Sequence, residues 1–161
     1  MSGEHQGFPG TLSIGQEAVE LFLVELVRSA ALTFRQVMLV SAHGGNAQPV
    51  TRAVRRLRSE GRNVLAWAPR WGGDAHAGRT GTSVMRALTP DQVRLDAALP
   101  GNTTPIQDLL PQLRESGLSL VTSNGVLGDP ASAHAEEGET LLQRAAADLT
   151  EMVNSQRIAR A

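Results

Sequence analysis

Apolar and polar residues follow one another along this chain with the periods of amphipathic helices and buried strands. Between residues 15 and 33 the apolar positions form one broad face and the charged positions fall largely on the other, which predicts a helix. The aliphatic runs 37–42 and 63–69 are short and bounded by turn residues, as central parallel strands are. A helix over residues 46–60, closed by Gly61, joins them. Together these segments predict a βαβ unit.

The second half of the chain alternates in the same way. Its pattern predicts helices over residues 77–88, 105–116 and 133–160, and short strands over residues 91–95 and 118–121. No internal repeat or linker interrupts residues 1–161, so we expect a single domain. Alternating strands and helices favour a three-layer α/β/α arrangement around a mostly parallel sheet.

Composition places the chain among ordinary globular proteins and removes several function classes. Its 161 residues are 41% hydrophobic and 19% charged, with a net charge of −1. A general nucleic-acid binder carries a basic excess, so the arginines of the 46–60 helix are expected to form a solvated face. The absence of cysteine excludes disulfides and thiolate metal sites and fits a cytoplasmic location. No apolar run reaches the roughly 20 residues that cross a bilayer.

Candidate chemistry begins where the first predicted strand ends. His43 lies at that end, Gly44 and Gly45 keep side chains away, and Asn46 opens the next helix. In a parallel α/β sheet, ligands bind beyond the carboxyl ends of the strands. We therefore interpret His43 as a functional residue rather than a core histidine, and expect Asn46 to cap its helix or to line the site.

A second histidine, His76, lies between Asp74 and Gly78, just ahead of a predicted helix. It could be a metal ligand or a general acid and base near neutral pH, with Asp74 orienting it. The alternative is a helix-capping Asp74 beside an exposed histidine. We expect this segment to face the first one across the sheet, and we expect His134 to be exposed.

The N-terminal 15 residues have the composition of a shaped loop, in which Glu4 and His5 are candidates for the rim of a site. The alternative is a tail whose Phe8 packs on the core. No G-x-S-x-G elbow supports a serine hydrolase, and no G-x-G-x-x-G turn supports a dinucleotide-binding protein. The residues alone indicate an α/β domain with a small-molecule or metal site.

These motifs together resemble the creatininase family of metal-dependent amidohydrolases. The resemblance lies in SGEHQGFPGTLSIG (2–15), VSAHGGN (40–46), DAHAG (74–78) and NGVLGDP (124–130), which occur in the family's order. With GNTTPIQDLLPQLR (101–114), they are most similar to the branch of that family that acts in mycofactocin biosynthesis by releasing a C-terminal dipeptide from a precursor peptide. The resemblance implies a creatininase-type fold, a homo-oligomer, and a peptide substrate or maturation-pathway proteins as partners.

The resemblance also assigns roles by position. His43 matches a metal-binding histidine, and His76 matches the catalytic histidine that carries a proton to the leaving nitrogen. Glu4, His5, Asn46 and Asp74 are expected to line the site or to bind substrate. In the family a divalent metal such as Zn, Fe or Mn activates water to attack an amide carbonyl.

Two departures from the family pattern change the expected ligand set. The segment that supplies a glutamate, a histidine and a bridging aspartate has no counterpart here, so we expect the domain without roughly its first third. The family's carboxylate in His-Ala-Gly-x-x-Glu-Thr-Ser is replaced by Gly81. His43 then remains as the one ligand, which predicts poor metal binding and an open sheet edge. The alternative to a peptidase is a non-catalytic binding or oligomeric scaffold module of the same fold.

Overall fold

The computed structural model describes residues 3–158, which fall into two compact units divided after Pro69. Met1 and Ser2, where the first family motif begins, lie outside the described residues, as do residues 159 and 160 of the predicted last helix. Each unit is described by itself below.

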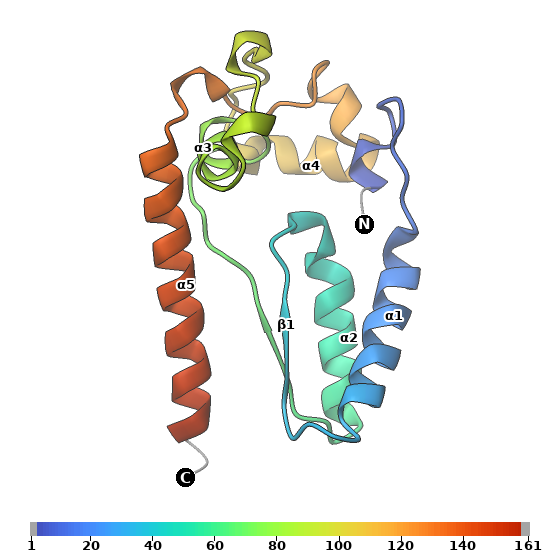
Figure 1. Ribbon diagram of the computed structural model, residues 1–161. Coiled ribbons are helices and arrows are strands. Elements are labelled where there is room, and N and C mark those ends of the chain that lie inside the picture. Colours follow the sequence, from blue (N-terminus) through green and yellow to red (C-terminus); the bar gives the residue numbers. More distant parts are fainter. Residues whose placement is uncertain (1–2, 159–161) are drawn as a thin grey trace. The chain divides into compact units, whose positions relative to one another are not determined.

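Unit 1 contains the predicted βαβ arrangement (Figure 1). Its elements are α1 (Gly15–Ala30), β1 (Val37–Val40), α2 (Ala47–Ser59) and β2 (Val64–Trp67). The two strands are parallel, with Val37 opposite Val64 and Val40 opposite Trp67. The predicted α/β class with parallel strands is therefore confirmed.

The core of unit 1 is aliphatic and joins both helices to the second strand. Val24 and Val27 of α1 meet Leu57 of α2 and Val64 of β2, and all four side chains are at most 1% exposed. Val24 and Val27 lie three residues apart in α1, and Pro49, Ala53 and Leu57 lie four residues apart in α2, which places each set on one face of its helix. Packing of these faces, more than helix propensity, stabilises the two helices.

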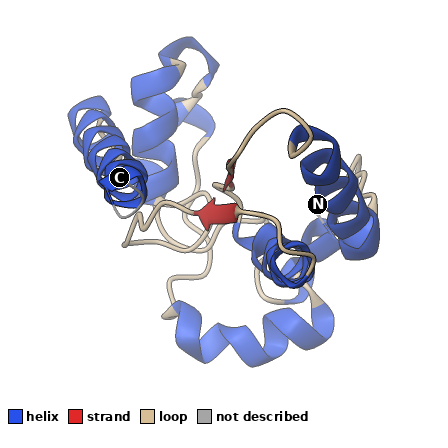
Figure 2. Cartoon of the chain, turned by 90° about the horizontal axis from the view of Figure 1, so that it is seen from below, coloured by secondary structure: helices blue, strands red, loops and turns tan. Residues whose placement is uncertain are grey.

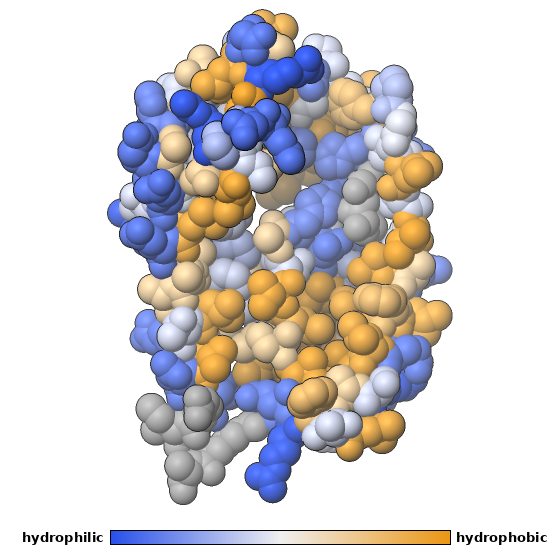
Figure 3. Space-filling view, viewed as in Figure 1, coloured by the Kyte–Doolittle hydropathy of each residue, from blue (hydrophilic) through white to orange (hydrophobic). Residues whose placement is uncertain are grey.

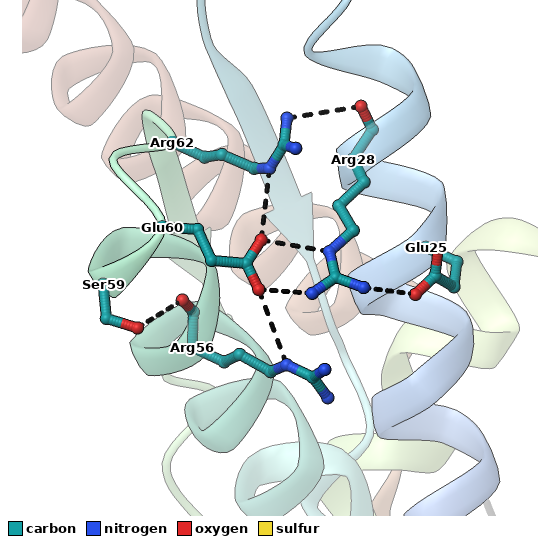
Figure 4. A network of polar contacts seen from close by, with 6 residues as sticks. All are labelled: Glu25, Arg28, Arg56, Ser59, Glu60 and Arg62. Carbon is teal, nitrogen blue, oxygen red and sulfur yellow. Dashed lines mark hydrogen bonds and ion pairs between the residues drawn. The ribbon is translucent and has the colours of Figure 1, made fainter.

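An ion-pair network joins the C-terminal ends of α1 and α2 (Figure 4). The Arg28 guanidinium donates two hydrogen bonds to the Glu60 carboxylate, at 3.0 and 2.5 Å, and one to Glu25 at 2.5 Å. Arg56 and Arg62 also contact Glu60, at 3.5 and 3.3 Å. These contacts occupy part of the arginine-rich face of α2 within the protein, as expected for a structural rather than a phosphate-binding surface.

Unit 1 leaves a large apolar surface uncovered. Within residues 3–158 the sheet has only two strands, so each has an open edge. Phe22 and Leu26 of α1 are 61% and 49% exposed, and Phe34 and Val40 around β1 are 63% and 57% exposed. Figure 3 shows this apolar surface over β1 and along α1. The expected open sheet edge is present, and surfaces of this kind favour association.

Unit 2 consists of helices joined by loops and short 3-10 turns (Figure 2). Its helices are α3 (Arg79–Leu88), α4 (Ile106–Ser116) and α5 (Ala135–Ile158). The close packing of α3 on α5 requires Gly138, because a Cβ atom there would collide with the backbone carbonyl of Ser83. Ser83 is fully buried at this crossing and donates to Glu137 at 2.7 Å.

The two short strands predicted in unit 2 are wrong. Residues 91–95 overlap the 3-10 turns Pro90–Gln92 and Leu95–Ala97, since Pro90 favours the first position of a turn. The segment 118–121 begins with a third such turn, Leu118–Leu120. Leu118 is 2% exposed and Leu120 is 67% exposed, whereas residues two apart in a strand share one face. None of the helices within residues 3–158 is long and apolar enough to span a membrane.

Candidate functional site

Glu4, His5 and His43 converge at the carboxyl end of β1 in unit 1. Oε1 of Glu4 lies 2.8 Å from Nε2 of His43 and 3.6 Å from Nδ1 of His5. The two imidazole rings stack with their centroids 6.3 Å apart and their planes 22° from parallel. One donor atom from each of the three side chains lies within 4.8 Å of the other two. The structure thus joins two segments that are almost forty residues apart in the sequence.

The N-terminal loop presents its two side chains through hydrogen bonds of its own. The His5 carbonyl accepts from the Phe8 N–H at 2.9 Å and from the Thr11 hydroxyl at 2.9 Å. Opposite the loop, Gly45 allows the close approach. A Cβ atom at Gly45 would lie 2.6 Å from Oε1 of Glu4. The loop is therefore shaped as predicted, and the second glycine of HGGN makes room for its carboxylate.

The donor set of this cluster fits a divalent metal ion. Two imidazoles and one carboxylate suit Zn, Fe or Mn, and three protein ligands are the usual number in a catalytic zinc site. Donors that share one ion at about 2.1 Å must lie within about 4.2 Å of one another, which is near the observed spacing. Counting family positions leaves His43 alone, but the structure brings Glu4 and His5 beside it. Glu4 and His5 are therefore further candidate ligands beside the one that was predicted, His43.

Two further polar residues lie next to this cluster in the chain. Asn46 begins α2 and donates its backbone N–H to the His43 carbonyl at 3.0 Å, but its side chain does not cap the helix. Ser41, just beyond β1, has a buried hydroxyl with no hydrogen-bond partner within the described residues. Buried polar groups are rarely left unpaired. Sequence reasoning assigned Ser41 no role of its own, although the residue is part of the VSAHGGN motif.

His76 belongs to unit 2, where a single β-bridge pairs it with Leu127. Its Nδ1 atom lies 2.7 Å from the Gly125 carbonyl. Because a carbonyl oxygen only accepts, Nδ1 carries the proton in this contact, and the neutral ring then has its basic lone pair on Nε2. This tautomer suits a group that accepts a proton at Nε2 and later returns it. The NGVLGDP loop therefore orients the candidate catalytic histidine.

Asp74 caps α3, which was the alternative to orienting His76. Its Oδ2 atom accepts the backbone N–H of Arg79, the first residue of α3, at 2.5 Å. Gly78 and Gly128 pack so closely on Asp74 that a Cβ atom at either would collide with its carboxylate. His134, expected to be exposed, is exposed. Gly81 lies in α3 with open space around the position of a Cβ atom.

Sequence comparisons show which known proteins this chain is similar to. A family model described as "Creatininase: Creatinine amidohydrolase" matches residues 1–153. The mycofactocin precursor peptide peptidase of Mycolicibacterium smegmatis is 46% identical over 155 residues, which are 95% of this chain and 60% of that protein. The protein of the same name from Mycobacterium tuberculosis H37Rv is 49% identical over 142 residues, 87% of this chain and 56% of that protein. The chain thus spans less than two thirds of the length of these relatives. No solved structure matches it.

Proposed function

Because this chain belongs to the creatininase family, we propose that it acts on amide or peptide bonds as a divalent-metal-dependent hydrolase. The observation that carries the proposal is the convergence of Glu4, His5 and His43 within 4.8 Å. Its relatives are mycofactocin precursor peptide peptidases, so the proposed substrate is a mycofactocin precursor peptide. The resemblance described from the sequence indicates which peptide bond is cleaved, namely the bond whose hydrolysis releases a C-terminal dipeptide.

Each site residue has a distinct role in this proposal. Glu4, His5 and His43 hold a metal ion, with Zn, Fe and Mn as candidates. The bound ion supplies Lewis acidity, which lowers the pKa of water and polarises a carbonyl. His76 takes up a proton at Nε2 and delivers it to the leaving nitrogen, and the Gly125 carbonyl fixes its tautomer from the opposite side of the ring. Asn46 lines the site beside His43.

One observation favours a second candidate function. Unit 1 exposes Phe22, Leu26, Phe34 and Val40 together with an open strand edge. Such a surface suits a scaffold that forms homo-oligomers or docks with maturation-pathway proteins without catalysing a reaction. Gly81 supports this alternative, since it lacks the carboxylate of the family pattern.

The proposed function is tested by measuring metal binding and peptide cleavage separately. Purified chain is incubated with a mycofactocin precursor peptide and with Zn, Fe or Mn in turn, and released dipeptide is measured by mass spectrometry. We expect dipeptide with at least one metal. His43→Ala should lose bound metal and cleavage together, whereas His76→Ala should lose cleavage and keep the metal.

A matched control comes from the exposed histidine at position 134. His134→Ala should leave metal content and cleavage unchanged, because His134 lies outside both groups of site residues. Failure of the wild-type chain to bind any of the three metals would overturn the hydrolase. Stoichiometric metal without cleavage would favour the scaffold instead.

A further inference from the structure

Unit 2 contains a pocket whose lining includes neither the metal cluster nor His76. Its volume is about 600 Å³, within the range of roughly 300–1,000 Å³ typical of small-molecule sites. One side is α3, and the others are the loops around residues 92–99 and 124–130. Its lining includes Gly81, Thr82, Met85, Arg94, Leu99 and Val126.

The pocket wall is mainly apolar and its side chains are open to solvent. Met85 is 43% exposed and Leu99 is 67% exposed, although both are large apolar residues. Together with Val126 they present aliphatic surface around a concavity. Apolar side chains in a concave site are a common way of binding the apolar part of a ligand.

Arg94 is the one ionisable residue in this lining. Its side chain is exposed, and its guanidinium forms no hydrogen bond or ion pair with any residue of the described part of the chain. Arg79 of the same unit, by contrast, is paired with Glu137 at 2.9 Å. A planar guanidinium without a partner is well suited to a carboxylate, which it can bind through two parallel hydrogen bonds.

The pocket owes part of its space to Gly81. This residue lies in α3 and lines the pocket, and a Cβ atom built on it would meet nothing within 4 Å. Its backbone is compatible with any residue, because its φ is not in the left-handed region. A larger side chain at position 81 would therefore enter open space rather than disturb packing.

We propose that this pocket binds a small apolar carboxylate, with the apolar group against Met85 and Leu99 and the carboxylate on Arg94. Two sources share this chemistry, namely a free apolar carboxylic acid and the C-terminal residue of a peptide. The site needs neither the metal cluster nor His76, since none of those residues lines it.

Calorimetric titration of the full chain tests this site. The probe is N-acetylphenylalanine, and N-acetylphenylalanine amide is its uncharged match. EDTA is present throughout, so that a carboxylate held by a metal cannot contribute. We expect the acid to bind at least about tenfold more tightly than the amide, because a charge-assisted pair is lost with the charge. Equal binding of acid and amide, or no binding of the acid, would overturn the proposal.

Two pairs of variants locate the binding. Arg94→Gln should weaken binding of the acid about tenfold or more, whereas Arg114→Gln, an exposed arginine on α4, should not change it. Gly81→Leu should abolish binding by filling the pocket, and Gly81→Ala should bind more weakly than wild type but better than Leu. Circular dichroism should show both Gly81 variants folded with unfolding temperatures no lower than wild type. A folded Gly81→Leu that binds normally would refute the assignment.

A third titration separates the two sources of the ligand. The tripeptide acetyl-Ala-Ala-Phe carries the same C-terminal residue and the same charge as the small acid. If it binds as tightly as N-acetylphenylalanine, the pocket accepts a peptide C-terminus. If only the small acid binds, the pocket takes a free carboxylic acid.

Discussion

Replacing Gly45 by alanine should weaken metal binding without unfolding the protein. The added Cβ atom would lie 2.6 Å from Oε1 of Glu4 and 2.8 Å from Cε1 of His43. Unbonded carbon and oxygen atoms approach to roughly 3.3–3.6 Å, so an overlap of about 0.7–1 Å must be relieved. The Glu4 carboxylate is the end of a flexible side chain, whereas His43 lies close to the end of β1. Glu4 is therefore expected to move, and its 2.8 Å contact with His43 is lost.

The size of the effect follows from this displacement. Gly45 orients a ligand rather than contributing one, and disturbing groups that orient metal ligands typically costs about 10- to 100-fold in affinity. That corresponds to about 1.4–2.8 kcal/mol of binding free energy. The free energy of unfolding should change by less than about 1 kcal/mol, because the overlap is relieved at a side-chain end.

The neighbouring glycine supplies the control for this experiment. A Cβ atom at Gly44 would meet nothing within 4 Å, so Gly44→Ala makes the same chemical change without the overlap. Zn and Mn titrations of both variants, with thermal unfolding in parallel, measure the two effects. If Gly45→Ala binds metal as tightly as Gly44→Ala, the close packing of Glu4 on HGGN does not position a ligand, and the reasoning fails.

Three further predictions test other parts of unit 1. Hydrogen bonds from Arg28 lower the pKa of Glu60 to about 2. The ion pairs of Glu60 therefore stabilise the fold above the usual pKa of 4.5, and this stabilisation is lost as pH falls toward 2. Glu60→Gln should lower the unfolding temperature at pH 7 but not near pH 2. Ser41→Ala should raise the free energy of unfolding by about 1 kcal/mol in denaturant titrations, and a loss of stability would show that the hydroxyl has a partner. Replacing Phe22 and Leu26 by lysine should reduce self-association in sedimentation velocity, and a wild-type chain that sediments as a monomer would contradict this.

Local patterns were sufficient for the elements of unit 1. The helical spacing of Val24 and Val27 predicts a helix, because that face of α1 is buried. The aliphatic run 37–42 predicts a strand, but β1 is half-buried rather than buried and its last residue, Val40, is exposed. The same reasoning failed at Leu118 and Leu120. A short apolar segment forms a strand only when another strand is available to pair with it, and that depends on contacts that the segment itself does not encode.

The candidate site was predictable in part, because some of its residues follow a local sequence pattern and others are brought together only by the fold. His43 could be singled out because the end of a parallel strand is a site in itself. The family resemblance pointed to His76, but not to the Gly125 carbonyl that fixes its tautomer. The sequence placed Glu4 and His5 only at the rim of the site. Their close approach to His43 could not be predicted, because it depends on how the N-terminal loop folds and on the absence of a side chain at Gly45. The pocket beside Arg94 gave no sequence signal, since it is formed by three segments whose positions only the fold determines.

Carboxylate binding in the pocket and dipeptide release can be separated at position 81. The family pattern has a glutamate there, and in this chain Gly81 instead opens the wall of a pocket that contains Arg94. Gly81→Glu would add a carboxylate of opposite charge to that pocket, so it should compete with N-acetylphenylalanine and weaken its binding. Because the three donors at Glu4, His5 and His43 do not include residue 81, the substitution should leave dipeptide release unchanged. A gain in dipeptide release would instead show that position 81 supplies a missing ligand, and that three donors are too few for catalysis.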